Sequence, residues 1–340
     1  MYNSITPPIQ HSRLQWFQRH IEKLWWAHSA YALLLGIGIM WLGARNFAYL
    51  RIAVFHVAVI WLISLFLPTL LNHPRVPPNW TPRIRLVANF FNKNLYQQVL
   101  FFVLPIYYES ATLTSGNFFF VVLVGLSATL STLDIIYDRH LSVRRSLTAL
   151  FFAFNLFVLI NVMLPVMWSL SNTWTTRIGA AAAALGLLSF YFSAAKPMLR
   201  IALPGIIAIP LIVLVELGRP YIPPAPLRLT AVEFGTDFER TAMQIESPLT
   251  ALSPARALWL YGLTAIKAPL GLKERVRHRW YVNDTLIWDS PYHIIVGGRE
   301  AGFRFWTRCF FDSIPPKAKL RLDVETEGGQ LIGRAWLGKP

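Results

Sequence analysis

Residues 201–226 read IALPGIIAIPLIVLVELGRPYIPPAP, and the composition of the chain changes within them. Before Leu217 the chain consists mainly of apolar stretches close to the length of a bilayer span. After it, a polar tail alternates between apolar and polar residues in the manner of β-strands. The four prolines between Pro220 and Pro226 predict a stiff, extended spacer over residues 218–226. We therefore expect two parts, a transmembrane domain over residues 25–217 and a β-domain over residues 227–340.

The composition of the whole chain supports a membrane protein. Of its 340 residues 54% are hydrophobic and 14% are charged, with 13 Trp, 12 Tyr and 23 Phe. Soluble domains carry about 25% charged residues, and aromatic belts mark membrane interfaces. The net charge of +15 is explained by basic cytoplasmic loops, so we expect no nucleic-acid partner. With Cys309 as its one cysteine, the chain can form neither an intramolecular disulfide nor a cysteine-based zinc site.

Seven apolar stretches approach the roughly 20 residues of a span. They are Trp25–Gly43, Ile52–Leu71, Tyr96–Thr112, Asn117–Ile136, Leu147–Trp168, Ile178–Ala195 and Ile201–Leu217. The third is short and carries Gln97, Gln98 and Glu109, so six or eight spans remain possible. The fold class that follows is a polytopic α-helical membrane domain of about seven spans, followed by the β-domain.

The charges of the connections predict an orientation. Twelve Lys and Arg residues fall on one set of alternating connections and three on the other. Cytoplasmic loops carry the excess of basic residues. We therefore expect a cytoplasmic N-terminus, with residues 1–24 as an amphipathic segment on the membrane surface. The tail would then face the periplasm from the inner membrane of a bacterium.

The predicted spans contain few groups that could bind a substrate or carry protons. The intramembrane polar candidates are His56, Glu109, Asp134, Asn155 and Glu216. Ionisable groups within a membrane often mark transport or catalysis. The acids, however, lie near the ends of the spans, where water hydrates them. An asparagine within a span more often forms hydrogen bonds between helices.

The tail predicts an antiparallel β-sandwich. Residues 275–282 alternate with Val276, His278 and Trp280 on one face, and Asn283-Asp284 marks a turn into a returning strand. A second hairpin is predicted over residues 320–337, turning at Gly328-Gly329. With further candidates the tail holds seven or eight short strands, the pattern of an immunoglobulin-like sandwich.

Three stretches of the tail carry a resemblance: HRWYVND (278–284), GGREAGFRFWTR (297–308) and LDVETEGGQLIGR (322–334). They resemble a bacterial domain catalogued as domain of unknown function 2914. The membrane half resembles its usual companion, domain of unknown function 5924, mainly by arrangement. The resemblance implies a proteobacterial inner-membrane protein. It implies no activity and no catalytic residues.

The candidate binding surface of the tail is basic and aromatic. It comprises Arg275, Arg277, Arg279, Tyr281, Arg299, Arg304, Trp306 and Arg308. Guanidinium groups match carboxylate and phosphate geometry, and aromatic rings stack on sugars or peptides. Such a face would hold an anionic glycan, a lipid headgroup or an acidic protein. The alternative is a solvated face whose arginines pair with Glu274, Asp289, Glu300 and Asp323.

Catalytic motifs do not stand out. His278 alternates with core residues, and the chain has no HExxH or nucleophile-elbow pattern. We therefore expect no cofactor and no metal. The leading hypothesis is a non-enzymatic binding or scaffold protein that presents the sandwich to an envelope partner. The alternatives are a membrane enzyme or transporter for a lipid-linked substrate, and an envelope sensor.

Overall fold

The structure is a computed structural model, and it describes residues 96–133, 136–141, 143–191, 197–251, 256–315 and 318–337, besides residues 30 and 34. His56, Asp134 and the N-terminal segment 1–24 lie outside the described residues. The same holds for the first two predicted spans, apart from residues 30 and 34.

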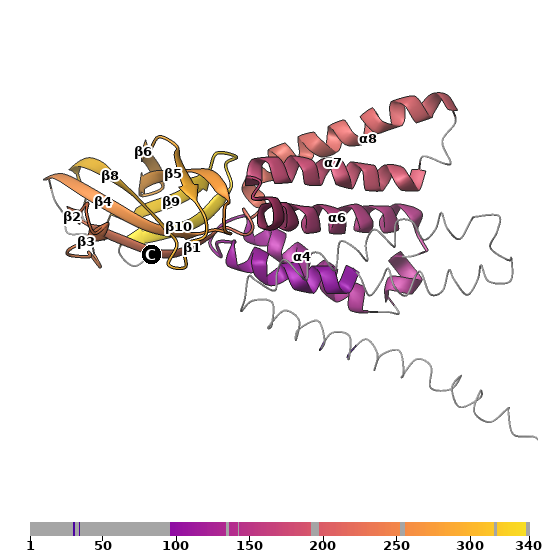
Figure 1. Ribbon diagram of the computed structural model, residues 1–340, viewed down its shortest axis with the longest axis horizontal. Helices are drawn as coiled ribbons and strands as arrows, with labels where there is room; N and C mark the ends of the chain where they lie inside the picture. Colours follow the sequence, from indigo (N-terminus) through magenta and orange to yellow (C-terminus); the bar gives the residue numbers. More distant parts are fainter. Residues whose placement is uncertain are drawn as a thin grey trace, which may run out of the picture.

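The helices lie side by side along the long axis of the molecule, with the β-domain at one end (Figure 1). They comprise residues 96–109, α4 (Phe118–Thr132), α6 (Arg145–Trp168), α7 (Asn172–Tyr191) and α8 (Pro197–Gly218). Two short turns accompany them, η1 (Tyr137–Leu141) and η3 (Arg219–Tyr221). A core of fully buried residues, among them Tyr107, Val124 and Val158, joins the first helices.

The prediction of about seven spans is wrong. Among the described residues one helix, α6, with 24 residues, is long and apolar enough to cross a membrane. Within the predicted third span, residues 96–109 are helical. The fourth forms α4 with 15 residues, short of the roughly 20 that a span needs. The first turns of α7 contain Thr175, Thr176 and Arg177. Among the predicted spans within the described residues, the fifth therefore coincides with a helix that meets both criteria, α6.

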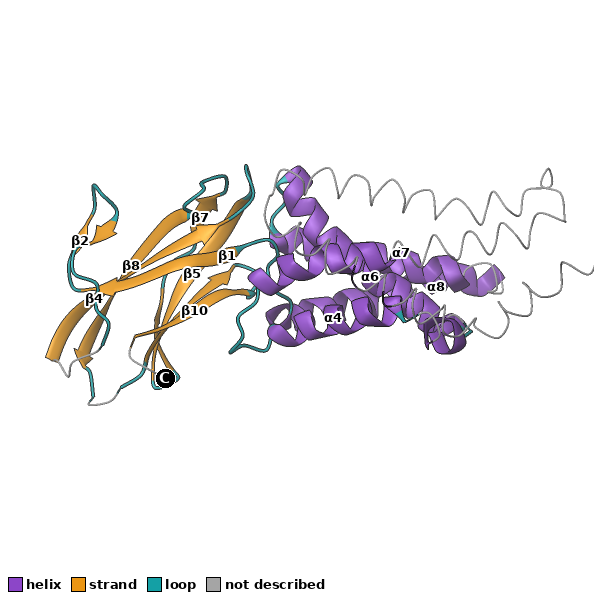
Figure 2. Cartoon of the chain, turned by 90° about the horizontal axis from the view of Figure 1, so that it is seen from below, coloured by secondary structure: helices purple, strands orange, loops and turns teal. Residues whose placement is uncertain are grey.

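The tail is the predicted antiparallel sandwich, seen from another side in Figure 2. One sheet has the order β1-β4-β8, formed by β1 (Arg228–Gly235), β4 (Arg256–Lys267) and β8 (Phe303–Ser313). The second has the order β10-β9-β5-β6, with β7 also paired to β5. Its strands are β5 (Lys273–Val282), β6 (Thr285–Asp289), β7 (His293–Val296), β9 (Leu320–Thr326) and β10 (Leu331–Leu337). A small hairpin joins β2 (Phe238–Glu239) to β3 (Gln244–Ile245).

The strand order is that of the immunoglobulin fold. In chain order β1, β4 and β8 take the places of strands A, B and E, and β5, β6, β9 and β10 those of C, C′, F and G. Trp280 lies on β5, fully buried, at the place of the tryptophan that immunoglobulin domains carry on strand C. Its indole fits because Gly262 lies opposite: a Cβ there would come within 2.8 Å of the Trp280 Cζ2. The predicted turn at Asn283-Asp284 is confirmed by positive φ angles of 47° and 64°.

The sandwich packs directly against the ends of the helices. Residues 222–227, within and beyond the proline-rich segment, are buried. The Asn117 side chain donates to the Leu331 carbonyl at 3.1 Å, and the Gln330 side chain donates to the Ile222 carbonyl at 3.0 Å. These polar contacts hold the sandwich in one orientation on the bundle.

Candidate functional site

The predicted basic surface is divided between two faces of the sandwich. Arg275, Arg277, Arg279 and Tyr281 alternate with buried residues on β5, so they lie on the outer face of the five-stranded sheet. Arg304, Trp306 and Arg308 lie on the outer face of the three-stranded sheet, because β8 belongs to it. Arg299 precedes β8 and covers the ring of Phe303 at 4.8 Å. The structure therefore does not unite the eight residues in one site.

The arginines of the five-stranded sheet are paired with carboxylates. Arg277 contacts Asp289 at 3.0 Å and Glu325 at 3.3 Å, and Arg279 contacts Glu325 at 3.2 Å. Arg275 likewise contacts Glu327 at 2.7 Å. Pairing of opposite charges across neighbouring strands stabilises a sheet modestly and leaves little charge for a ligand.

The same pairing continues at the next strands. Arg334 contacts Asp323 at 2.7 Å, and hydrogen bonding to Asp323 raises the pKa of the Arg334 guanidinium. The Arg321 guanidinium lies 3.9 Å from the ring centroid of Tyr281 and 5.3 Å from that of Trp336. This face is self-paired, as in the alternative stated from the sequence, but its partners differ in part. Asp289 pairs with Arg277 and Asp323 with Arg321 and Arg334. Glu274 instead accepts from Asn172, and Glu325 and Glu327 are partners that were not expected.

On the opposite face, the β2–β3 hairpin covers part of the three-stranded sheet. Phe238 stacks on Tyr261 with centroids 5.7 Å apart and on Trp306 with centroids 4.6 Å apart. The Arg304 guanidinium donates to the carbonyls of Ala242 at 3.2 Å and Met243 at 3.0 Å. Arg304 therefore holds the hairpin through hydrogen bonds, and the hairpin packs on the ring of Trp306.

Arg308 is a member of the predicted set that stays available. Its side chain is exposed, and its guanidinium lies 4.7 Å from the ring of Trp259. Within the described part of the chain no carboxylate forms an ion pair with it. Stacking on an aromatic ring orients the guanidinium fork while leaving its N–H groups open to an anion.

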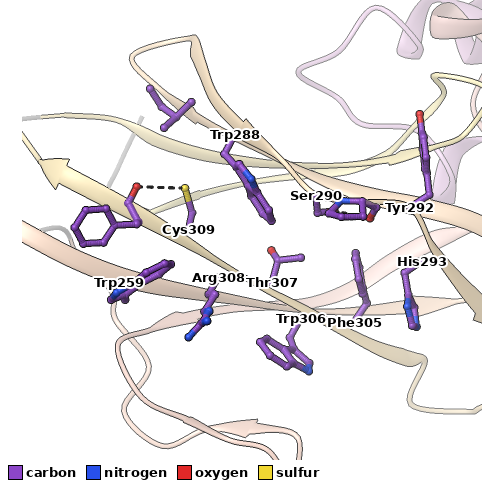
Figure 3. A pocket seen from close by; sticks show the side chains of 13 residues that line it. Trp259, Trp288, Ser290, Tyr292, His293, Phe305, Trp306, Thr307, Arg308 and Cys309 are labelled. Carbon is purple, nitrogen blue, oxygen red and sulfur yellow. Dashed lines mark hydrogen bonds between the residues drawn. The ribbon is translucent and has the colours of Figure 1, made fainter.

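Beside Arg308 the sandwich is hollowed by a groove of about 640 Å³ (Figure 3). It is lined by Arg308, by smaller residues and by six aromatic side chains. The six are Trp259, Trp288, Tyr292, Phe305, Trp306 and Phe310. One wall is β8, the edge strand of the three-stranded sheet, and the other is β6 with the segment that leads to β7. We call this cavity the aromatic groove.

Exposed apolar side chains lie on both walls of the groove, with Trp259 46% and Phe310 40% accessible on one side. All five residues of β6 are exposed, and Ile287 and Trp288 remain 46% and 36% accessible. Exposed apolar patches with a polar rim mark interaction sites on soluble surfaces. The aromatic residues are visible in the sequence. That β6 and β8 lie in different sheets and face each other across the groove is seen only in the structure.

The floor of the groove is a closed hydrogen-bond network around His278. Its Nδ1 lies 2.8 Å from the Thr307 hydroxyl and its Nε2 lies 2.9 Å from the Thr264 hydroxyl. Thr264 donates its proton to the Phe305 carbonyl at 3.1 Å, so it accepts from Nε2–H, and Nδ1 accepts from Thr307. Trp280 Nε1 donates to Thr307 at 3.0 Å. This network assigns a neutral imidazole protonated on Nε2.

Burial lowers the pKa of His278 to about 3, so the imidazole stays uncharged at neutral pH. The Ser290 hydroxyl is also engaged: it accepts from the His278 amide at 2.9 Å and donates to the Pro291 carbonyl at 3.0 Å. Since these hydroxyl and imidazole groups are occupied by one another, the floor supports binding by shape rather than acid–base chemistry.

The polar candidates of the helices that the structure describes hold structural contacts. Glu109 forms an ion pair with Arg228 of β1. Glu216 contacts Arg177 at 2.7 Å and Arg219 at 3.0 Å. The Asn155 side chain donates to the Phe151 carbonyl of its own helix at 2.7 Å. Among the described residues, no group of three or more His, Cys, Asp or Glu side chains is placed to hold a metal.

One buried contact agrees with the expectation that an asparagine within a span bonds between helices, and a second is not apparent from the sequence. Asn161 donates to the Tyr107 hydroxyl at 3.0 Å and accepts from Thr175 at 3.0 Å, which joins three helices. Glu274 of β5 accepts from both the backbone and side-chain nitrogens of Asn172, at 2.7 and 3.2 Å. A carboxylate at the first residue of α7 is favoured by the helix dipole. Burial nevertheless raises the pKa of Glu274.

The fold and the groove define a two-part class of protein, in which a helical bundle carries an immunoglobulin-like sandwich with an open edge. The chain belongs to the Family of unknown function (DUF5924), whose model matches residues 8–267 and thus extends through β4. The resemblance to family 5924 is therefore confirmed, whereas no match supports family 2914 in the tail. No curated protein and no solved structure matches the chain.

Proposed function

We propose that the protein is a membrane-anchored binding protein whose aromatic groove holds a partner of the bacterial cell envelope. The observation that carries the proposal is the groove itself: six aromatic side chains beside an arginine without a carboxylate partner in the described chain. Aromatic and arginine residues dominate the energetics of protein interfaces. The engaged polar groups of the floor favour a binding function over an enzymatic one.

Exposed apolar side chains support anchoring of the helices in a bilayer. Phe119, Leu126, Leu150, Leu185 and Leu214, from four different helices, are each 57% or more exposed. In water such a surface would be costly, whereas lipid tails solvate it. We place the helical part in the membrane and the sandwich in the adjoining aqueous compartment.

The distribution of basic residues supports a periplasmic sandwich. Arg139, Arg144, Arg145 and Arg200 belong to η1 and to the starts of α6 and α8. The other ends of α6 and α8 meet the sandwich, since Ser169 contacts Leu270 and η3 leads into β1. Basic residues favour the cytoplasmic side, so the sandwich would lie opposite, in the periplasm.

The test compares groove variants of the full chain in lipid nanodiscs. Immobilised wild type, Trp259→Ala and Arg308→Glu are exposed to periplasmic extract, and retained proteins are identified by mass spectrometry. Arg299→Glu is the matched control, because Arg299 is also exposed and stacked on an aromatic ring but lies outside the groove. We expect one set of proteins to be retained by wild type and the control and lost by both groove variants. Equal retention by all four proteins would contradict the proposal.

A further inference from the structure

We propose that the occupant of the aromatic groove is an extended, acidic segment of another protein, which adds to β8 as a fourth strand of the three-stranded sheet. This inference deepens the proposed function and rests on it. It names the chemistry of the partner and the hydrogen bonds that would hold it.

The first support is the edge of β8. This strand of 11 residues pairs with β4 along its length, from Phe303 opposite Ile266 to Ser313 opposite Arg256. In the described chain no strand pairs with its other edge. In an antiparallel sheet alternate residues of an edge strand direct their N–H and C=O groups outward, ready to pair with another chain. Constant-type immunoglobulin domains fill this position with strand D.

The second support is that, among the described residues, a ring contact covers this edge at one end. His293 of β7 stacks on Phe305, with ring centroids 5.4 Å apart and planes 8° from parallel. Beyond Phe305 the groove follows β8 as far as Phe310. At about 3.3 Å per residue, these six residues span about 20 Å, the length of a short strand. Natural proteins protect such an edge with charges, proline or a bulge, and here Arg308 is the one charged residue between Phe305 and Phe310.

The third support is the alternation of side chains along the edge. Thr307 and Cys309 are buried and face the other sheet, while Arg308 and Phe310 are exposed on the outer face. An added strand would alternate in the same way. Its inward residues would meet the apolar wall at Trp288, and its outward residue beside Arg308 would gain from a carboxylate. The expected core of the ligand is therefore an acidic residue between two apolar ones.

The engaged side chains of the groove argue for a peptide over a sugar. The Thr307 and Ser290 hydroxyls, which line it, already have hydrogen-bond partners. A glycan needs side-chain partners for its hydroxyls, whereas a peptide strand satisfies its polar groups on the backbone edge. Along the unpaired edge of β8 the available groups are backbone N–H and C=O groups, the kind that a peptide strand uses.

The experiment uses the full chain in nanodiscs and a synthetic library of heptapeptides. Each peptide has Glu at the centre and Val, Ile, Leu or Phe at positions one, three, five and seven, with Thr between. The central Glu can meet Arg308 in either strand direction. The best binder is remade with Lys in place of Glu. It is also remade as two methylated peptides, each with one of the two alternate sets of backbone nitrogens methylated. Binding is measured by fluorescence anisotropy, and the protection of amides 305–310 by hydrogen exchange.

We expect the Lys peptide, one of the two methylated peptides and the Arg308→Glu protein each to show binding weakened at least tenfold. Arg299→Glu should bind like wild type, and bound peptide should slow exchange of alternate amides of β8. Binding that tolerates methylation of both alternate sets of nitrogens would overturn strand addition. The proposal would also be overturned if no peptide of the library bound, or if a second copy of the chain protected the edge. Displacement of the peptide by anionic oligosaccharide or lipid alone would overturn it as well. The extract test measures whether the groove retains any partner, and none of these peptide results changes its outcome. Failure of strand addition can therefore be told apart from failure of the proposed binding function.

Discussion

The buried imidazole of His278 predicts an acid-sensitive sandwich. Burial lowers its pKa from 6.5 to about 3 in the folded protein, whereas an unfolded chain takes up the proton near 6.5. Between these values the unfolded state binds more protons, so the stability of the fold falls as the pH falls. From about pH 7.5 to about pH 4.5 the loss amounts to about 2.7 kcal/mol, since the full slope of about 1.4 kcal/mol per pH unit applies only over the roughly two units below 6.5.

The test compares the wild type with His278→Gln, which has no titratable group at this position. The one cysteine of the chain, Cys309, is buried in the sandwich, so its labelling reports opening of that part alone. Urea titrations are read at each pH with 4,4′-dithiodipyridine, which reacts with thiols in acid. Labelling of fully denatured protein at each pH corrects for the reagent. The carboxylates that titrate in this range are common to both proteins.

We expect His278→Gln to be less stable at neutral pH, because it disturbs the contacts with Thr264 and Thr307. Its stability should nevertheless fall less steeply with acid, by about 2 to 3 kcal/mol over the range. Parallel curves for the two proteins would refute the reasoning. They would mean that the folded sandwich accepts the proton, and that the closed hydrogen-bond network is not the state in solution.

Three further predictions concern packing and the junction of the two parts. Gly262→Ala should destabilise the sandwich by about 1 to 3 kcal/mol, because the new Cβ would lie 2.8 Å from the Trp280 ring. Cys309 labelling in urea measures this loss, and an unchanged stability would contradict the packing of Trp280 against Gly262. Glu274→Ala should leave the Asn172 amide without its partner and lower the free energy of unfolding by about 1 to 3 kcal/mol. Glu274→Gln retains an acceptor without a charge, so the same urea titration should show a smaller loss. Tyr107→Phe should remove the hydroxyl that bonds to both Val158 and Asn161. The thermal midpoint of the helical signal in circular dichroism should then fall, and an unchanged midpoint would contradict a role of this hydroxyl in joining the helices.

Local patterns in the tail were sufficient to predict its strands. The alternation of Val276, His278 and Trp280 identifies β5 because a strand exposes and buries successive residues wherever it lies in a sheet. The turn at Asn283-Asp284 follows from residues that tolerate positive φ. Both signals depend on neighbours in the sequence, which is why they agree with the structure.

The candidate surface depended on which sheet each strand joins, and this is not a local property. Arg277 and Arg308 both point outward from their strands, yet β5 and β8 lie in different sheets, so the two side chains occupy opposite faces. The ion pairs of Arg277 with Asp289 and Glu325 depend in turn on the register of β5 with its neighbours. The length of the helices was misjudged for a related reason, since an apolar run does not mark where a helix begins and ends.

Strand β5 connects the groove to the helices. At one end Glu274 accepts hydrogen bonds from the first residue of α7, and four residues further His278 supports the floor of the groove through Thr307. A strand bonded to neighbours on both sides is among the stiffest elements of a sandwich. The groove is therefore held in a fixed position relative to the helices rather than on a flexible tether. A fixed position lowers the entropic cost of binding a partner that is itself anchored in the envelope, and this favours a scaffold that presents its open edge to such a partner.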